Sequence, residues 1–151
     1  MDTSRLIRNV ANAVNLSSVL GLVLGVAGRG RLRRRGHLLV FENVRLSFIN
    51  ASAMTVGDVV LVPGRTIEEV ERRVPDLMAH EEAHAWQYAY CLGLPFIPLY
   101  ALAAGWSMFR SGDRATANHF EVQADLLKGG YAVGTKRPIS QAWRRRADRA
   151  A

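Results

Sequence analysis

The sequence has little cysteine: Cys91 is the one thiol in 151 residues. A single thiol cannot form a disulfide within the chain, so nothing indicates an oxidising compartment, and we expect a cytoplasmic protein. It also cannot supply the thiolates of a cysteine-rich zinc site, so any metal must be held by histidines and carboxylates. Hydrophobic residues make up 49% and charged residues 22%, which indicates a folded globular chain rather than a disordered one.

The sequence also lacks a small-residue cleavage site after its apolar N-terminal stretch. Residues 9–28 carry no charge, but asparagines interrupt the first half, and the strongly apolar part is only residues 16–27. That length is typical of a core helix, an interfacial helix or the apolar part of a signal peptide. Arginines follow where a cleavage site would be, which argues against a signal. A helix packed on the domain and a membrane-associated helix both stay open.

Acidic residues are too few to balance the basic ones, and the net charge is +7. The excess gathers in two clusters: Arg29, Arg31, Arg33, Arg34 and Arg35, and then Arg144, Arg145, Arg146 and Arg149. Such clusters bind anionic lipid, nucleic acid or an acidic partner, or are simply solvated. Nucleic acid is the weakest of these partners, because no aromatic residues are interleaved to stack on bases. An anionic membrane surface stays open as a partner.

The pattern of residues predicts an α+β fold without internal repeats. A small N-terminal β-sheet is expected over residues 37–62, with a half-buried strand at residues 44–48 and a hairpin over residues 54–62. A capping-box pattern at Thr66 and Glu69 then opens a short helix. Longer helices are expected at about residues 76–92, 98–110 and 117–128.

The helix expected at 76–92 carries His80-Glu81-Glu82-Ala83-His84. Histidines four residues apart lie on one helix face, so His80 and His84 can both reach one Zn²⁺. Glu81 lies beside that face, where its carboxylate can take a proton from a water on the metal. The alternative is a surface helix with an exposed polar stripe, but apolar residues surround the motif, and burying its polar side chains is costly unless something uses them.

A third ligand is needed, and no third histidine stands at the metzincin spacing. The candidates lie in the helix expected at about 117–128. Glu121 and Asp125 are four residues apart, so one carboxylate can bind the metal while the other accepts the ring N–H of a ligating histidine. His119 is a rival ligand. Without a metal, Glu121 would make a capping contact with Asn118, and Asp125 would face solvent.

The two motifs together, H-E-x-x-H followed by N-x-x-E-x-x-x-D, resemble those of the gluzincin group of zinc metallopeptidases. The chain is also similar to short bacterial metallopeptidase domains that read H-E-x-x-H-x-x-Q and later E-x-x-A-D, a pattern that Gln87 and Ala124-Asp125 match. The resemblance covers about residues 53–130 and implies a zincin-like fold. In that fold a sheet edge lines the cleft beside the active-site helix, and residues 59–62 are our candidate for that edge.

The resemblance also implies roles for individual residues. It places zinc on His80, His84 and Glu121, with Glu81 as the general base and Asp125 as the carboxylate that orients a ligand. Gluzincins often stabilise the oxyanion with a histidine or tyrosine beyond the glutamate ligand, and His119 and Tyr131 are the candidates here.

The expected function is cleavage of peptide bonds in a peptide or protein substrate, by a zinc-bound water that Glu81 activates. The alternative is a catalytically weak zinc-binding module tethered to a membrane surface or to an acidic partner. In either case the chain divides into an N-terminal apolar and basic helical segment (1–36), a zincin-like metal-binding domain (37–135) and a basic tail (136–151).

Overall fold

Residues 59–62 read Val-Val-Leu-Val, a run typical of a strand that is buried on both faces. In the computed structural model, which describes residues 2–143, this run is strand β4 (Val59–Pro63) in a four-stranded sheet of order β1-β2-β4-β3. Its inner neighbour β2 (Leu38–Val44) runs parallel to it. Strands β1 (Arg31–Arg35) and β3 (Met54–Val56) form the two edges, each antiparallel to its neighbour.

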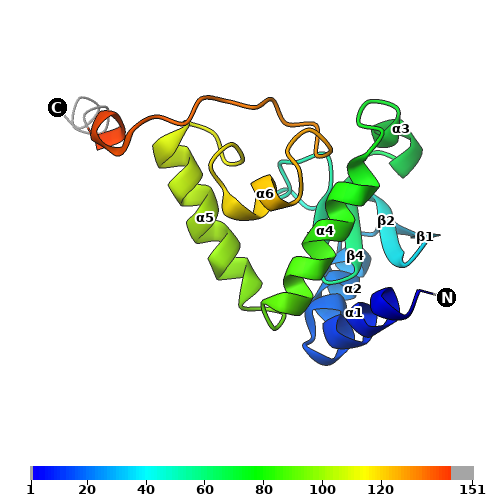
Figure 1. The fold of residues 1–151 in the computed structure, drawn as a ribbon. Helices are drawn as coiled ribbons and strands as arrows, with labels where there is room; N and C mark the ends of the chain where they lie inside the picture. The colour runs from blue at the N-terminus through cyan, green and yellow to red at the C-terminus, as the bar shows by residue number, and fades with distance from the viewer. Residues whose placement is uncertain (1, 144–151) are drawn as a thin grey trace.

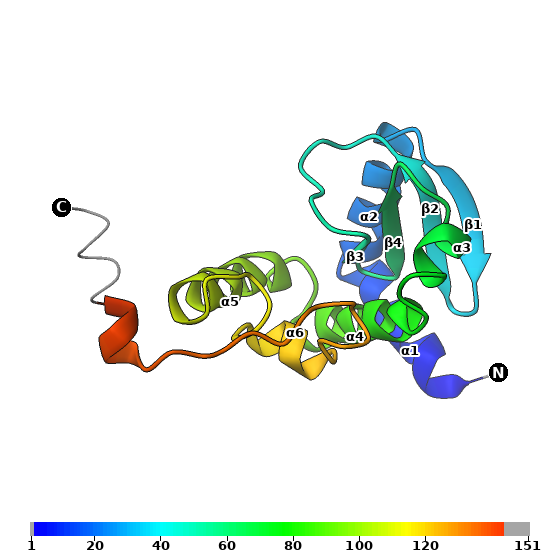
Figure 2. The ribbon, with the colours of Figure 1, turned by 90° about the horizontal axis from the view of Figure 1, so that it is seen from above.

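Helices cover both faces of the sheet, as Figure 2 shows for α2 (Ser17–Ala27) on one side and α3 (Ile67–Glu71) on the other. Alternate residues of β4 point into two hydrophobic clusters, one under α2 and one under α3 and α4 (Leu77–Tyr90). Helix α5 (Phe96–Arg110) extends away from the sheet after α4 (Figure 1). The α+β class is therefore confirmed.

Two glycines let α2 lie directly on the sheet. A Cβ on Gly21 would stand 2.5 Å from the carbonyl oxygen of Val56, and a Cβ on Gly25 would stand within 2.6 Å of ring atoms of Phe41. Any larger side chain at these positions would push the helix outward. The face of α2 with the two glycines is therefore the buried one, and valines occupy the opposite, exposed face.

A buried ion-pair network fixes the N-terminal helix α1 (Thr3–Val14) to α4. The guanidinium of Arg8, which is 1% exposed, donates to Asp58 and to Glu82, each at 2.8 Å. It also lies 5.3 Å from the ring centroid of Trp86. A charge this deeply buried is stable only while its partners remain in place, so α1 is an integral part of the fold.

The sheet differs from the expectation in two places. The strand expected at residues 44–48 does not form, because β2 ends at Val44 and residues 45–53 are irregular, with a turn at 47–48 and a bend at 51–52. The segment 1–36, expected to be helical, is helical only up to Ala27, and its first arginine cluster supplies strand β1. A strand forms there because the antiparallel partner β2 offers free backbone groups along its outer edge. The hairpin over residues 54–62 is confirmed.

The helices after the sheet follow the expectation more closely. The capping box of Thr66 and Glu69 is present, and α4 and α5 lie where they were expected. The last helix, α6 (His119–Gln123), is much shorter than the expected 117–128. It ends because Asp125 adopts a left-handed conformation, with φ of 72°.

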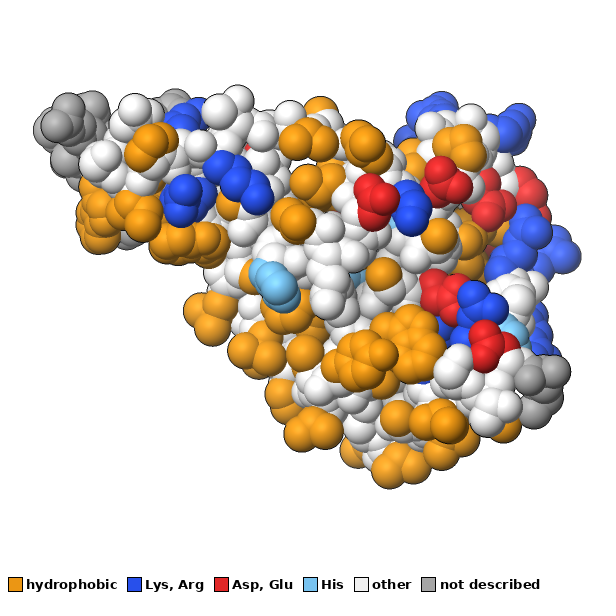
Figure 3. Space-filling model, in the orientation of Figure 1, with side chains coloured by type: hydrophobic (Ala, Val, Ile, Leu, Met, Phe, Trp, Pro, Cys, Tyr) orange, Lys and Arg blue, Asp and Glu red, His pale blue; other side chains and the backbone are white. Residues whose placement is uncertain are grey.

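The surface is divided between apolar and charged side chains. Figure 3 shows hydrophobic side chains along the lower left edge of the molecule, whereas charged side chains lie mostly along the upper and right-hand sides. Within residues 2–143, no single helix has the length and hydropathy needed to cross a bilayer; α1 and α2 pass only as a pair, bent by 74°. The second arginine cluster, residues 144–149, lies outside the described residues.

Replacing Arg8 by methionine leaves the carboxylates of Asp58 and Glu82 without their shared buried cation. We expect the free energy of unfolding to fall by about 3–5 kcal/mol, measured by urea denaturation. Arg5→Met is the matched control, because Arg5 pairs with the same Glu82 from a side chain that is 40% exposed. Its loss should be about 0–1 kcal/mol. Equal losses in the two variants would contradict the role given to Arg8.

Candidate metal centre

His80 and His84 lie one turn apart on the buried face of α4, as their spacing predicts. No glycine or proline interrupts residues 76–92, so the helix runs unbroken through both. The two residues are 2% and 7% exposed. Their Nε2 atoms are 3.1 Å apart, with the rings nearly perpendicular. The interpretation of this segment as an exposed polar stripe is therefore wrong.

The hydrogen bonds of the two rings decide which nitrogen carries the proton. Nδ1 of His80 lies 3.1 Å and 3.0 Å from the backbone carbonyl oxygens of Ala124 and Asp125, which can only accept. Nδ1 of His80 must therefore be the donor. In the neutral ring the other nitrogen, Nε2, then carries a lone pair and points into the site.

Gln87 fixes the ring of His84 in the same way. The Nε2 amide of Gln87 donates to the carbonyl oxygen of Phe120 at 2.9 Å, so the amide oxygen must be the atom that faces Nδ1 of His84, at 2.8 Å. Nδ1 of His84 is then a donor, and its Nε2 also carries a lone pair. When both rings are neutral, His80 and His84 thus present unprotonated Nε2 atoms to the same point.

Glu121 closes this group from α6, whose N-cap is Asn118. The Asn118 side chain accepts from the backbone N–H of Phe120, so Asn118 caps α6 as expected. Glu121 does not reach back to Asn118, so the expected contact between the two residues is wrong. Instead the Glu121 carboxylate lies 3.1 Å from Nε2 of His80 and 3.7 Å from Nε2 of His84. Glu121 is 1% exposed, and its Oε2 atom has no hydrogen-bond partner among residues 2–143.

The geometry of this group suits a small divalent cation. Ligands at 2.0–2.1 Å in a tetrahedral zinc site are separated by about 3.3 Å. Nε2 of His80 lies 3.1 Å from Nε2 of His84 and 3.1 Å from Oε2 of Glu121. Three acceptor atoms that face one another without an intervening hydrogen repel each other. A cation between them, or protonation of the imidazoles, relieves that repulsion. His80, His84 and Glu121 therefore form a group that could hold a metal ion.

The charges of the group reinforce one another. Burial lowers the pKa of His80 and His84, whereas the hydrogen bond and charge of Glu121 raise it. The raising effects outweigh the burial, so the net pKa of each histidine lies above the ordinary 6.5. Burial raises the pKa of Glu121, but the contacts with both histidines lower it well below the ordinary 4.5. Glu121 is thus ionised at neutral pH, as a metal ligand must be.

Tyr100 is a site residue that sequence patterns did not identify. From α5 its hydroxyl donates to Oε1 of Glu121, and its ring lies 6.1 Å from that of His84. Burial and the charge of Glu121 raise the pKa of Tyr100, so the hydroxyl remains a donor. Its position orients the carboxylate and leaves Oε2 for the metal. Nothing in the local sequence separates this tyrosine from a core aromatic.

The other predicted site residues have different outcomes. Tyr131 lies beside the centre, with its ring 5.8 Å from that of His80. His119 is exposed on α6 and is not in the metal-binding group. The carboxylate of Asp125 is also at the surface, where it accepts from the backbone of Leu127 and pairs with Lys128. The prediction that this carboxylate orients a histidine is wrong, since the backbone carbonyl of Asp125 does so.

Glu81 is buried next to the centre and is held from the sheet. Oγ1 of Thr55 donates to Oε2 of Glu81 at 2.6 Å. Thr55 belongs to β3, which is the edge of the sheet beside α4. Residues 59–62 form the inner strand β4, so the expectation that they line the edge is wrong, and β3 takes that place.

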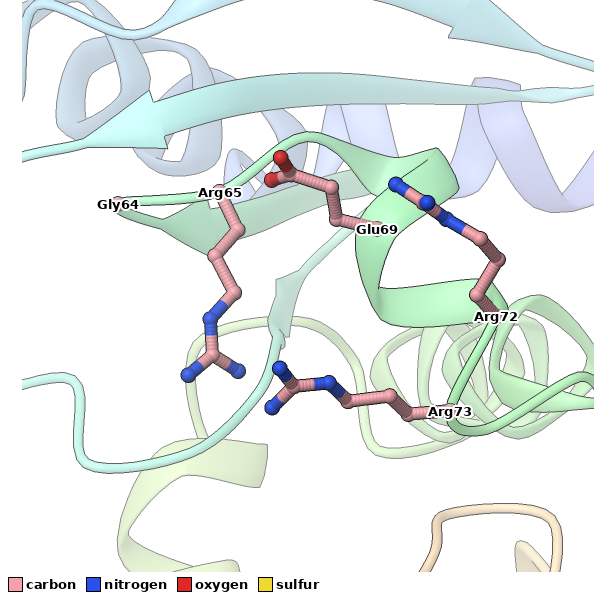
Figure 4. A pocket seen from close by; sticks show the side chains of 5 residues that line it. All are labelled: Gly64, Arg65, Glu69, Arg72 and Arg73. Atoms are coloured by element: carbon pink, nitrogen blue, oxygen red, sulfur yellow. The ribbon is translucent and has the colours of Figure 1, made fainter.

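A separate surface hollow of about 430 Å³ lies over α3 and the loop before it. Arg65, Arg72, Arg73, Glu69 and Gly64 line it, and the guanidinium groups of Arg65 and Arg73 face each other (Figure 4). The three arginines are exposed, and none belongs to the group of His80, His84 and Glu121. The hollow is therefore not part of the centre.

Comparison with protein-family models, with curated proteins and with solved structures gives no match. The resemblance to gluzincins therefore stays a prediction from the motifs, and function has to be argued from the site itself.

Gln87 and Asp125 provide a test of which groups orient the ligands. Gln87→Met removes the acceptor of the His84 ring, and we expect zinc affinity to fall by about 10- to 100-fold. Asp125→Asn keeps the backbone carbonyl that His80 uses, so zinc affinity should be unchanged. Competition with a fluorescent zinc chelator measures both. A larger loss in Asp125→Asn would show that the carboxylate matters after all.

The stabilisation by zinc should depend on pH. The histidine pKa values are raised in the metal-free fold, so their contribution to metal-free stability is present at low pH and is lost as pH rises through them. Zinc replaces those protons, so the rise in Tm on adding zinc should grow from about pH 5.5 to about pH 8. Melting curves with and without zinc measure it. A rise that is independent of pH would exclude zinc binding by these histidines.

Proposed function

We propose that the protein is a zinc-dependent hydrolase, in its most specific form a metallopeptidase. One observation carries the proposal: two imidazole nitrogens and one carboxylate converge in a buried site, and within residues 2–143 Oε2 of that carboxylate has no hydrogen-bond partner. Zn²⁺ suits this nitrogen and oxygen donor set better than Mg²⁺ or Ca²⁺. Three protein ligands leave a fourth position open, which is the arrangement of catalytic rather than structural zinc.

The residues around the centre have the chemistry that hydrolysis needs. A bound zinc would supply the positive charge that makes a water acidic near neutral pH and polarises a carbonyl. Glu81 would accept the proton of that water and pass it to the leaving amine. Thr55 holds one oxygen of the Glu81 carboxylate and so leaves the other for this transfer.

Tyr131 is the candidate for the oxyanion. Burial, followed by the charges of Glu121 and Glu81, raises its pKa, so the hydroxyl stays protonated and able to donate. The edge strand β3 gives an extended peptide a place to pair by backbone hydrogen bonds next to Glu81. A peptide or protein is therefore the proposed substrate.

The deep burial of the three ligands favours a second candidate, a zinc-binding module with little or no catalytic activity. Structural zinc sites are closed, and none of the three residues is more than 7% exposed. The two candidates share the metal and differ only in the use of Glu81.

Glu81→Gln separates them. We expect the variant to bind one equivalent of zinc and to fold as the wild type does, while hydrolysis of a peptide library or casein falls by about 100- to 10,000-fold. Thr55→Val should lower kcat with zinc content unchanged, and Thr55→Ser, which keeps the hydroxyl, should restore it. If the zinc-loaded wild type and the Glu81→Gln variant are equally inert, the protein is a zinc-binding module without catalytic activity. Purified protein that binds no zinc would contradict both candidate functions.

A further inference from the structure

Two uncharged segments that are far apart in the sequence meet at the C-terminal end of α4. The first is residues 9–28, and the second is residues 83–109. The turn between α4 and α5 contacts the turn between α1 and α2. Gly93 lies so near the side chain of Asn15 that a Cβ on Gly93 would stand 2.5 Å from it. The exposed apolar side chains of α1, α2, the α4–α5 turn and α5 thus form one surface, which we call the apolar rim.

The apolar rim is far more exposed than packing within the fold explains. Val14 is 77% exposed, Leu92 78% and Leu102 73%. Along α5, only Phe96 and Ser107 are buried, although no charged residue precedes Arg110. The orange edge in Figure 3 follows these elements. A helix with so much apolar surface in water indicates a partner that covers it.

Charge at the ends of the apolar rim indicates what that partner is. Arg29 and Arg45 are exposed where α2 ends, and the backbone N–H of Arg45 donates to Gly28, which holds the two arginines close together. Arg110 ends α5, with its guanidinium over the ring of Trp106. No acidic residue occurs in residues 3–41 or 83–112. An apolar surface with arginines at its ends and a tryptophan near one end matches the acyl and headgroup layers of an anionic bilayer.

We propose that the apolar rim docks the protein on the surface of an anionic lipid bilayer. A second copy of the chain fits less well, because a two-fold contact through the same rim would bring like-charged arginines together. The buried Arg8 network and the two glycines of α2 keep α1 and α2 on the domain, so the docked state uses the fold as it stands. The proposal does not depend on the metal or on hydrolysis.

The test is flotation of the full chain with vesicles of phosphatidylcholine alone and of phosphatidylcholine mixed with phosphatidylglycerol. The protein should float with the mixed vesicles and much less with the neutral ones. Val23→Glu combined with Leu102→Glu places charge on α2 and on α5, at side chains 57% and 73% exposed, so the fold tolerates it. We expect binding to the mixed vesicles to fall by at least about tenfold.

Leu127→Glu is the matched control. Leu127 is 70% exposed but follows α6, in the turn whose Gly129 lies against His80. His80 lies about three turns of α4 before the apolar rim begins. This variant should float like the wild type, and circular dichroism and melting curves should confirm that all variants fold. The proposal is overturned if the wild type floats with neither kind of vesicle, or if the double variant floats like the wild type. It is also overturned if light scattering shows that the wild type is a dimer and the double variant a monomer, and neither protein binds vesicles.

Discussion

The structure around the metal centre depends on the repulsion between three hydrogen-bond acceptors that the fold brings together. Two imidazole rings are held by carbonyl and amide oxygens at Nδ1, which forces their Nε2 lone pairs toward an ionised carboxylate. In the protein interior such a cluster of acceptors is unstable unless a cation enters or the rings gain protons. The raised pKa values of the histidines and the lowered pKa of Glu121 express the same need. Each describes a site that is completed by positive charge.

Much of the surrounding structure holds these acceptor atoms in place. The chain ends α6 abruptly at Asp125, where a left-handed residue turns two backbone carbonyls toward His80. A longer helix would have used those carbonyls in its own hydrogen bonds and left His80 free to rotate. Gln87 joins α4 to α6 by bonding both His84 and the backbone of Phe120. The short α6 is therefore a consequence of how the ligands are oriented.

The same features show what could be predicted from the sequence. The positions of His80, His84 and Glu121 follow from helical periodicity and from the need for a third ligand, and the structure brings them together. The role of Asp125 could not be predicted, because it depends on a backbone angle and the side chain of the residue is irrelevant to it. The role of Tyr100 could not be predicted either, since its contact with Glu121 joins two helices that only the tertiary fold brings together. Sequence patterns identify ligands better than they identify the groups that orient them.

The fold errors have a similar cause. The alternation at residues 44–48 is that of a strand, yet no neighbouring strand is available to pair with it, and the chain turns instead. The arginine-rich segment of β1 lacks the apolar alternation of a strand, but it pairs with the open edge of β2. Glu42 and α3 supply carboxylates for two of its arginines. Strand formation in this protein is decided by the partner and only weakly by the segment itself.

Helix α4 connects the separate parts of the molecule. Residues 80–84 of α4 include the histidines and Glu81, Glu82 pairs with the buried Arg8 of α1, and the end of α4 meets the apolar rim. Six residues of α4 follow His84 before the helix ends at Tyr90, a rise of about 9 Å. A surface that binds at the rim would therefore lie within one short helix of the metal centre. Because Glu81 and Glu82 are adjacent, the Arg8 network that anchors α1 also limits the movement of the residue proposed to accept the proton. Anchoring and chemistry thus depend on the same two turns of one helix.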